Sequence, residues 1–139
     1  MTATKNTPAA NRELVTGMYE AAKRGDFSAF LEPLAADIVV MEPGFLPYGG
    51  TYRGMEELQA LLVRVSGILD VTGMVVEQLI CDGDHVIGLI RVPVVGTASE
   101  VSLAELSVIR DGKIIEMRIF FHEAGPLIAP LAGRYATKG

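Results

Sequence analysis

The chain has 139 residues, of which 50% are hydrophobic and 21% charged, with a formal net charge of −5 at pH 7. This length and composition predict one globular domain with a proper core and argue against disorder. The acidic balance and the lack of a basic cluster argue against nucleic acid as a partner. A single cysteine, Cys81, excludes an internal disulfide and suits a reducing compartment.

The two ends of the chain look different from its middle. Residues 1–7 lack the apolar core of a signal peptide, and no segment reaches membrane-spanning length, so we expect a cytoplasmic protein without membrane contact. We expect residues 1–7 to be a disordered lead, residues 8–125 to form a single domain, and residues 126–139 to be a C-terminal tail.

Three helices are predicted in the first half of the chain. Apolar residues recur at helical spacing from Pro8 to Lys23, and Gly25 ends this helix. Asp26 is a good N-cap for a second, short helix. A third helix spans about residues 55–69, with its leucines and Val65 on one face.

An apolar strand over residues 37–42 lies between the second and third helices and ends in Glu42, directly before Pro43. The loop that follows, residues 43–50, is rich in proline and glycine. Its three large, mainly apolar side chains are Phe45, Leu46 and Tyr48. Because full exposure of such side chains is unfavourable, we expect the loop to fold over a pocket or an interface.

Four strands are predicted in the second half, over residues 71–81, 85–95, 99–110 and 113–122. Asp82-Gly83 and Asp111-Gly112 are strong hairpin signals, because a type I′ turn needs positive φ at both central residues. The second half is therefore expected to be an antiparallel meander. Helices followed by such a meander predict an α+β fold, with the helices packed on one face of a curved sheet.

Both faces of this sheet should be apolar. In the strand over residues 99–110, Glu105 shares a face with Leu103 and Ile109, while Leu106 points the opposite way. One face would meet the helices, and the other needs a cover. A second copy of the chain is the simplest cover, so we predict a homodimer.

Glu42 and Glu105 are the strongest candidates for chemistry, because each is a carboxylate within an apolar strand. Two acids in an apolar interior can serve as acid and base on a small molecule. Desolvation and mutual repulsion would leave one ionised and the other neutral. Structural alternatives stay open, since Glu42 could reach solvent at its strand end and Glu105 could bond a hydroxyl such as that of Ser107.

Four motifs make the chain resemble the NTF2-like superfamily, within the group of SnoaL-like polyketide cyclases and ketosteroid isomerases. They are Arg24-Gly25-Asp26, Val40-Met41-Glu42-Pro43, Pro47-Tyr48-Gly49-Gly50-Thr51-Tyr52-Arg53-Gly54 and Arg110-Asp111-Gly112-Lys113-Ile114-Ile115-Glu116-Met117-Arg118. The resemblance covers about residues 11–123. It implies a cone in which three N-terminal helices pack on a curved, mainly antiparallel sheet that encloses a deep pocket. Because the superfamily includes isomerases, cyclases, epoxide hydrolases, dehydratases and binding domains, the fold does not imply one reaction.

The ketosteroid isomerase pattern implies roles for particular residues. Glu42 falls where that family places its general base, and Glu105 where it keeps a protonated acid that donates to a developing oxyanion. The oxyanion-hole tyrosine of the first helix aligns with Met18, and Tyr19 lies one position away, about 100° around the helix. The tyrosine donor would then either come from elsewhere in the chain or be absent.

Tyr48 and Tyr52, in and after the loop, are the candidates for this donor, although each could instead serve packing of the loop or anchoring of the third helix. The resemblance implies a pocket lining that includes Met18, Phe45, Leu62, Ile90, Val92, Leu103, Met117, Ile119 and Phe121.

The sequence favours a cofactor-independent acid–base enzyme, an isomerase or cyclase, acting on a small apolar polyketide- or isoprenoid-like substrate. One alternative is an epoxide-opening cyclase or epoxide hydrolase, although Arg91 and Arg118 are expected to face away from the pocket. Another is a non-catalytic binding or dimerisation module. Two histidines without ligand spacing predict no metal site, and the absence of nucleotide-binding motifs predicts no cofactor.

Overall fold

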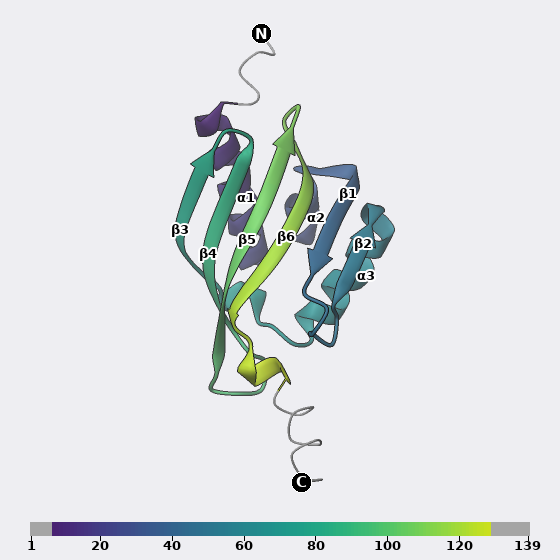
Figure 1. Cartoon of the computed structure of the whole chain (residues 1–139), viewed down its shortest axis with the longest axis vertical. Coiled ribbons are helices and arrows are strands. Elements are labelled where there is room, and N and C mark those ends of the chain that lie inside the picture. The colour runs from purple at the N-terminus through teal and green to yellow at the C-terminus, as the bar shows by residue number, and fades with distance from the viewer. Residues whose placement is uncertain (1–6, 129–139) are drawn as a thin grey trace.

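The computed structural model describes residues 7–128, which fold as a curved six-stranded sheet with helices on its concave face (Figure 1). The helices are α1 (Pro8–Arg24), α2 (Phe27–Leu31), α3 (Gly54–Ser66) and the 3-10 helix η2 (Val71–Gly73). The strands are β1 (Leu34–Glu42), β2 (Gly50–Arg53), β3 (Val75–Asp82), β4 (His85–Pro93), β5 (Glu100–Arg110) and β6 (Lys113–Glu123), in the spatial order β2-β1-β6-β5-β4-β3.

The predicted α+β class and the three N-terminal helices are confirmed, and local sequence explains the helix ends. The Thr7 side chain accepts a hydrogen bond from the Ala10 N–H, while Gly25, at φ 74°, ends α1 in the left-handed conformation that glycine adopts at low cost. The predicted N-cap of α2 is also confirmed, because the Asp26 carboxylate accepts from the Ala29 N–H at 3.1 Å.

The sheet extends beyond the predicted meander. β3 to β6 form the antiparallel meander predicted for the second half of the chain, while β1 pairs parallel to β6, and residues 50–53 form the short edge strand β2, which was not predicted. The predicted strand over 71–81 begins with the 3-10 helix, and the extended part starts only at Val75.

Both predicted hairpins are present, and one turn differs from the prediction. Asp111 and Gly112 have φ of 52° and 76°, as a type I′ turn requires. In the other hairpin Asp82 pairs with His85, so the central residues are Gly83 and Asp84. Of these two only Gly83 has positive φ, so the predicted type I′ turn at 82–83 was wrong.

The convex face of the sheet carries exposed apolar side chains and ion pairs. Ile80 and Phe120 are 44% and 51% exposed. Arg91 pairs with Glu77 and Glu100, and Arg118 with Glu116, so both arginines face away from the helices, as predicted. Within residues 7–128, no helix has the length and hydropathy of a membrane-spanning segment.

The C-terminal end of the described chain returns to the core. Residues 125–128 form a helical turn, and Leu127 is buried with the other core side chains. The predicted tail over 126–139 thus starts with packed residues. Residues 129–139 and the predicted lead up to residue 6 lie outside the described part of the chain.

Candidate acid–base site

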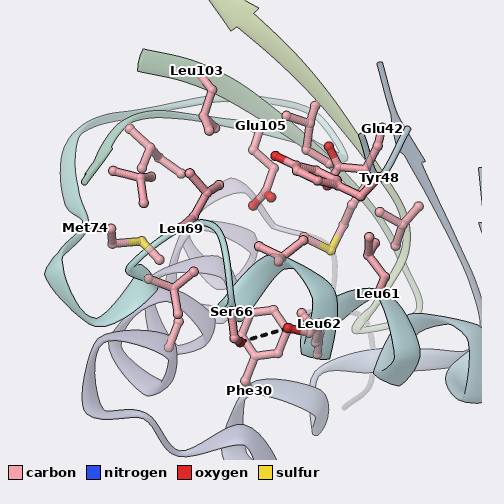
Figure 2. A pocket seen from close by; sticks show the side chains of 18 of the residues that line it. Phe30, Glu42, Tyr48, Leu61, Leu62, Ser66, Leu69, Met74, Leu103 and Glu105 are labelled. Atoms are coloured by element: carbon pink, nitrogen blue, oxygen red, sulfur yellow. Dashed lines mark hydrogen bonds between the residues drawn. The ribbon is translucent and has the colours of Figure 1, made fainter. Parts of the chain in front are cut away.

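A cavity lies between the concave face of the sheet and helices α1, α2 and α3, with a volume of about 870 Å³ including its open mouth. The space that the centre of a water-sized molecule can reach inside the cavity is about 110 Å³, below the range of about 300–1,000 Å³ found for pockets that hold drug-sized ligands. Figure 2 shows Glu42, Tyr48 and Glu105 on one side of the pocket and Phe30, Leu62 and Ser66 on the other. The Ser66 hydroxyl donates to the Leu62 carbonyl at 2.8 Å, which satisfies it within α3.

The polar groups of the cavity are few and come from separate elements. Glu42 ends β1, Glu105 lies in the middle of β5, Tyr19 projects from α1, and Tyr48 comes from the loop before β2. Apart from these four and Ser66, the lining side chains are aliphatic, aromatic or methionine, and no lysine, arginine or histidine of residues 7–128 lines the cavity. The site therefore offers carboxyl and phenol groups in an apolar surrounding.

Glu105 is held by Tyr19, whose hydroxyl donates to Glu105 Oε1 at 2.8 Å. The sheet leaves room for this hydroxyl because Gly88 is the β4 residue paired with Glu105. A Cβ at Gly88 would lie 2.6 Å from the Tyr19 Oη, closer than real Cβ contacts allow. Gly88 therefore forms a notch in which the phenol lies beside the carboxyl group. The alternative partner for Glu105, the Ser107 hydroxyl, is buried with no hydrogen bond.

Glu42 and Tyr48 differ from this arrangement, because each has a polar atom without a protein partner. Within residues 7–128, Glu42 Oε1 and the Tyr48 Oη are buried and accept or donate no hydrogen bond. The Tyr48 side chain is 1% exposed. Buried polar groups in native proteins are nearly always satisfied, so such a pair on a cavity wall is suited to hydrogen bonding with a ligand.

Burial shifts the pKa of all four groups upward. Desolvation, followed by the charge of Glu105, raises the pKa of Glu42 from its ordinary 4.5 to about 8. Desolvation also raises the pKa of Glu105 to about 7, and the hydrogen bond from Tyr19 opposes this rise by favouring the charged form. The pKa values of Tyr19 and Tyr48 are raised by burial and then by Glu105 and Glu42 respectively, so both remain neutral donors.

The predicted site residues are brought together only in part. Glu42, Glu105 and Tyr48 line the cavity, as do the predicted lining residues Leu62, Ile90, Val92, Leu103, Met117, Ile119 and Phe121. Three others do not line it: Met18 is fully buried in the core, Phe45 is 56% exposed, and the Tyr52 hydroxyl donates to the Tyr48 carbonyl.

Tyr19 had no predicted role, because the tyrosine position of the first helix aligned with Met18. In the structure Tyr19, not Met18, faces Glu105, and its hydroxyl donates to that carboxyl group. Val15, Met18, Tyr19 and Ala22 are all buried, because α1 packs a broad face against the sheet. Helical spacing could not decide which of the neighbouring residues points at the carboxyl group.

Several lining residues were missed by the sequence reading. They come mainly from the helices and the segment after α3, and they are Tyr19, Ala22, Phe27, Phe30, Val40, Leu58, Leu61, Val65, Ser66, Leu69, Val71 and Met74. The leucine face of α3 was predicted, but the spacing of apolar residues is the same in a helix that lines a cavity and in one that packs into a core. Within the described residues, no group of three potential metal ligands is present.

Comparison with known proteins agrees with this architecture. An NTF2-like protein of unknown function from Burkholderia pseudomallei K96243 is similar, with a TM-score of 0.74 and 24% identity over 86% of this chain and 95% of that chain. An NTF2-like protein from Burkholderia thailandensis E264 gives 0.73 and 27% over 86% and 95%. TerC, co-crystallised with polyporic acid, gives 0.68 and 26% over 83% and 92%. No curated protein matches the sequence.

A sequence profile of the SnoaL-like domain matches residues 15–117, which is most of the chain. This range includes α1 from Val15 onward, all of β1 to β5, and the four polar residues of the cavity. The similar solved structures share the curved sheet and its helices over nearly their whole length. The chain therefore belongs to the SnoaL-like family and has the NTF2-like fold that its motifs predicted.

Proposed function

We infer that the protein is a cofactor-independent acid–base enzyme that isomerises or cyclises a small, largely apolar ketone of polyketide or isoprenoid type. The observation that carries this proposal is the pairing of two carboxyl groups on one apolar cavity, with Glu42 Oε1 and the Tyr48 hydroxyl free to bond a ligand. Membership of the SnoaL-like family supports a pocket for a small molecule, and the four polar residues of the cavity support the type of reaction.

In the proposed mechanism Glu42 is the base. Its carboxylate removes a proton from a carbon beside the substrate carbonyl, and the electron pair moves onto the carbonyl oxygen. Protonated Glu105 and the Tyr48 hydroxyl donate hydrogen bonds to that oxygen. Glu42 then returns its proton to a different carbon, which gives an isomer. Alternatively the enolate carbon attacks a second carbonyl and closes a ring, and the Glu42 proton passes to the alkoxide that forms there. Both routes restore the Glu42 carboxylate.

Tyr19 has a supporting role in this scheme. Its hydroxyl hydrogen is directed at Glu105 Oε1, so it orients the carboxyl group and leaves the second oxygen to carry the proton toward the substrate. In the ligand-free site the pKa of Glu105 is the lower of the two, about 7 against about 8. Without a ligand, the form with Glu42 ionised and Glu105 protonated is therefore the less populated of the two singly ionised forms. A substrate oxygen that accepts a hydrogen bond from protonated Glu105 increases the population of this form.

TerC supports the ligand class only in a general way, since it was crystallised with the small organic molecule polyporic acid. The lining of this chain's own cavity supports it more directly. The described residues that line the cavity include carboxyl groups and no cationic side chain, which favours an uncharged ligand over an anion.

Proton exchange with 2-tetralone in D₂O tests the proposal without knowledge of the natural substrate. This neutral bicyclic ketone has acidic C–H groups beside its carbonyl, and proton NMR measures their replacement by deuterium. We expect the protein to accelerate the exchange and the E42Q variant to lose the acceleration while still binding the ketone. An E42Q variant as fast as the parent chain would exclude Glu42 as the base. Saturable binding with no acceleration in the parent chain would instead indicate a binding module.

The same proposal includes a homodimer formed through the convex face of the sheet. This face carries exposed Ile80 and Phe120 together with charged side chains of both signs. It can therefore be complementary to itself across a two-fold axis. Sedimentation should give the dimer mass for the parent chain and a monomer for F120E. V63E, at a 75% exposed position on α3, is the matched control and should stay dimeric. A monomeric parent chain would contradict the dimer.

A further inference from the structure

We propose that Tyr52 and Arg64, which lie outside the cavity lining, are positioning residues that clamp the loop over residues 43–49 and so hold the Tyr48 hydroxyl in the cavity near Glu42, where it can donate to the substrate oxygen. This deepens the acid–base function proposed above and rests on it for the role of Tyr48. It also gives Tyr52 a role other than the direct contact with substrate expected from the sequence.

The need for a clamp follows from the surroundings of Tyr48. Its ring is buried on the cavity side, yet its hydroxyl has no hydrogen-bond partner among the described residues. Tyr48 and Glu42 both line the cavity and lie on the same side of it (Figure 2). Since no hydrogen bond fixes the tip of this side chain, its direction depends on where the backbone of the loop is held.

Two neighbouring carbonyl groups of the loop are held from the side. The Tyr52 hydroxyl donates to the Tyr48 carbonyl at 2.7 Å, and Arg64 Nη2 donates to the Pro47 carbonyl at 2.7 Å. Arg64 Nη1 also lies 3.5 Å from the Tyr52 hydroxyl, so the two donors are joined. The charged guanidinium makes its carbonyl bond stronger than a neutral one.

The loop is compact enough for this hold to reach the Tyr48 side chain. The Leu46 N–H donates to the Pro43 carbonyl and the Gly49 N–H to the Leu46 carbonyl, at 3.1 and 3.0 Å. Gly49 packs so tightly that a Cβ there would overlap the Pro43 carbonyl oxygen. A loop closed by its own hydrogen bonds moves as one piece, so fixing two of its carbonyls fixes the base of the Tyr48 ring.

The clamp also connects the loop to the opposite wall of the cavity. Arg64 belongs to α3, and its neighbours Leu61, Leu62 and Val65 line the cavity. Tyr52 belongs to β2, which pairs with β1 beside Glu42. The same two residues therefore join the loop to the helix that bounds the ligand space and to the strand that carries the proposed base.

A catalysis-independent experiment tests the geometry. In protein labelled with ¹³C at the tyrosine Cζ, the chemical shift of the Tyr48 resonance is measured against pH. It should show an inflection where Glu42 titrates, and E42Q should abolish this inflection. We expect Y52F and R64M, which remove the donors but keep most of the bulk, to lose most of that inflection. R53M is the matched arginine control, because only the Arg53 backbone N–H donates a hydrogen bond in the structure, and it should behave like the parent chain. An unchanged inflection in both Y52F and R64M would overturn the clamp.

A double-mutant cycle tests what the clamp does for the reaction. Y52F should lower kcat for 2-tetralone exchange by about tenfold, the size of one lost hydrogen bond, with KM nearly unchanged. In the Y48F background the same change should have no further effect, because the hydroxyl that it positions is gone. A fall of equal size in both backgrounds would contradict the positioning role. If the parent chain exchanges nothing but the inflection is lost in Y52F, the catalytic function fails and the clamp stands.

Discussion

The two carboxyl groups of the cavity are buried alike but supported differently. Glu105, in the middle of β5, has a fixed partner in Tyr19, which itself lies in the notch over Gly88. Glu42, at the end of β1, has an oxygen without a partner and lies beside a loop residue with the same deficit. The satisfied group is held in place by the sheet and α1, whereas the unsatisfied group faces the space where a ligand would lie.

The difference in hydrogen bonding also affects how basic the two carboxyl groups are. Burial is the largest cause of both raised carboxyl pKa values; the Tyr19 hydrogen bond opposes the rise at Glu105, to about 7, and the charge of Glu105 adds to the rise at Glu42, to about 8. A hydrogen bond to the charged form offsets part of the desolvation cost, and Glu42 lacks that compensation. An unpaired buried carboxylate is a stronger base, which suits proton abstraction from carbon.

The largest expected effect comes from removing the base. E42Q should lower proton exchange about 10²–10⁴-fold, the usual range for a general base, because an amide cannot accept the proton. E105Q should be much milder, since its amide can still donate a hydrogen bond. NMR exchange rates for the two variants, with circular dichroism to check folding, make the comparison. Equal losses in both variants would mean that Glu105 must itself transfer a proton.

The same E42Q variant should be more stable than the parent chain at high pH. The folded protein holds the Glu42 proton up to about pH 8, whereas the unfolded chain loses it near the ordinary 4.5. Unfolding therefore becomes more favourable as pH rises between these values. The full loss in the free energy of unfolding is reached above pH 8. E42Q should gain on the order of a few kcal/mol in the free energy of unfolding at pH 9 and little at pH 4. Urea denaturation at both pH values measures this, and a gain independent of pH would contradict it.

Filling the notch at Gly88 should weaken the support of Glu105 without replacing any polar side chain. In G88A the added methyl must displace the Tyr19 hydroxyl, so the hydrogen bond to Glu105 is lost or lengthened. We expect a destabilisation of about 1–3 kcal/mol. Y19F removes the same hydrogen bond without steric displacement and is the control. If G88A leaves the pKa of Glu105 unchanged in ¹³C carboxyl NMR, the notch does not position the phenol.

The smallest expected effect is a change in the pH profile. In the parent chain, exchange should peak between about pH 7 and 8, where one of the two carboxyl groups is ionised and the other protonated. The amide of E105Q stays a hydrogen-bond donor at every pH and has no proton to lose, so the alkaline limb of the profile near pH 8 should disappear. An alkaline limb that stays in place would contradict Glu105 as the acid.

Local patterns were enough to predict much of the fold. Capping residues such as Asp26, the glycine after α1 and the Asp111-Gly112 turn act over a few neighbours, so their consequences are visible in sequence. The short strand β2 could not be recognised in the same way. It is defined by pairing with β1 rather than by its own four residues, and strand propensity depends on such context.

The candidate site shows the same division at the level of side chains. Alternation within strands determined that Glu105 shares the inner face with Leu103, and the apolar run before Pro43 marked Glu42 as unusual. The sequence by itself thus determined the fold class and the two carboxyl groups. Only the tertiary structure decided that Tyr19 rather than Met18 reaches Glu105, that Tyr52 holds Tyr48 from outside the cavity, and that Gly88 makes room. These choices depend on how far apart separate elements lie and on helix rotations of about 100°, which periodicity along one chain segment does not encode.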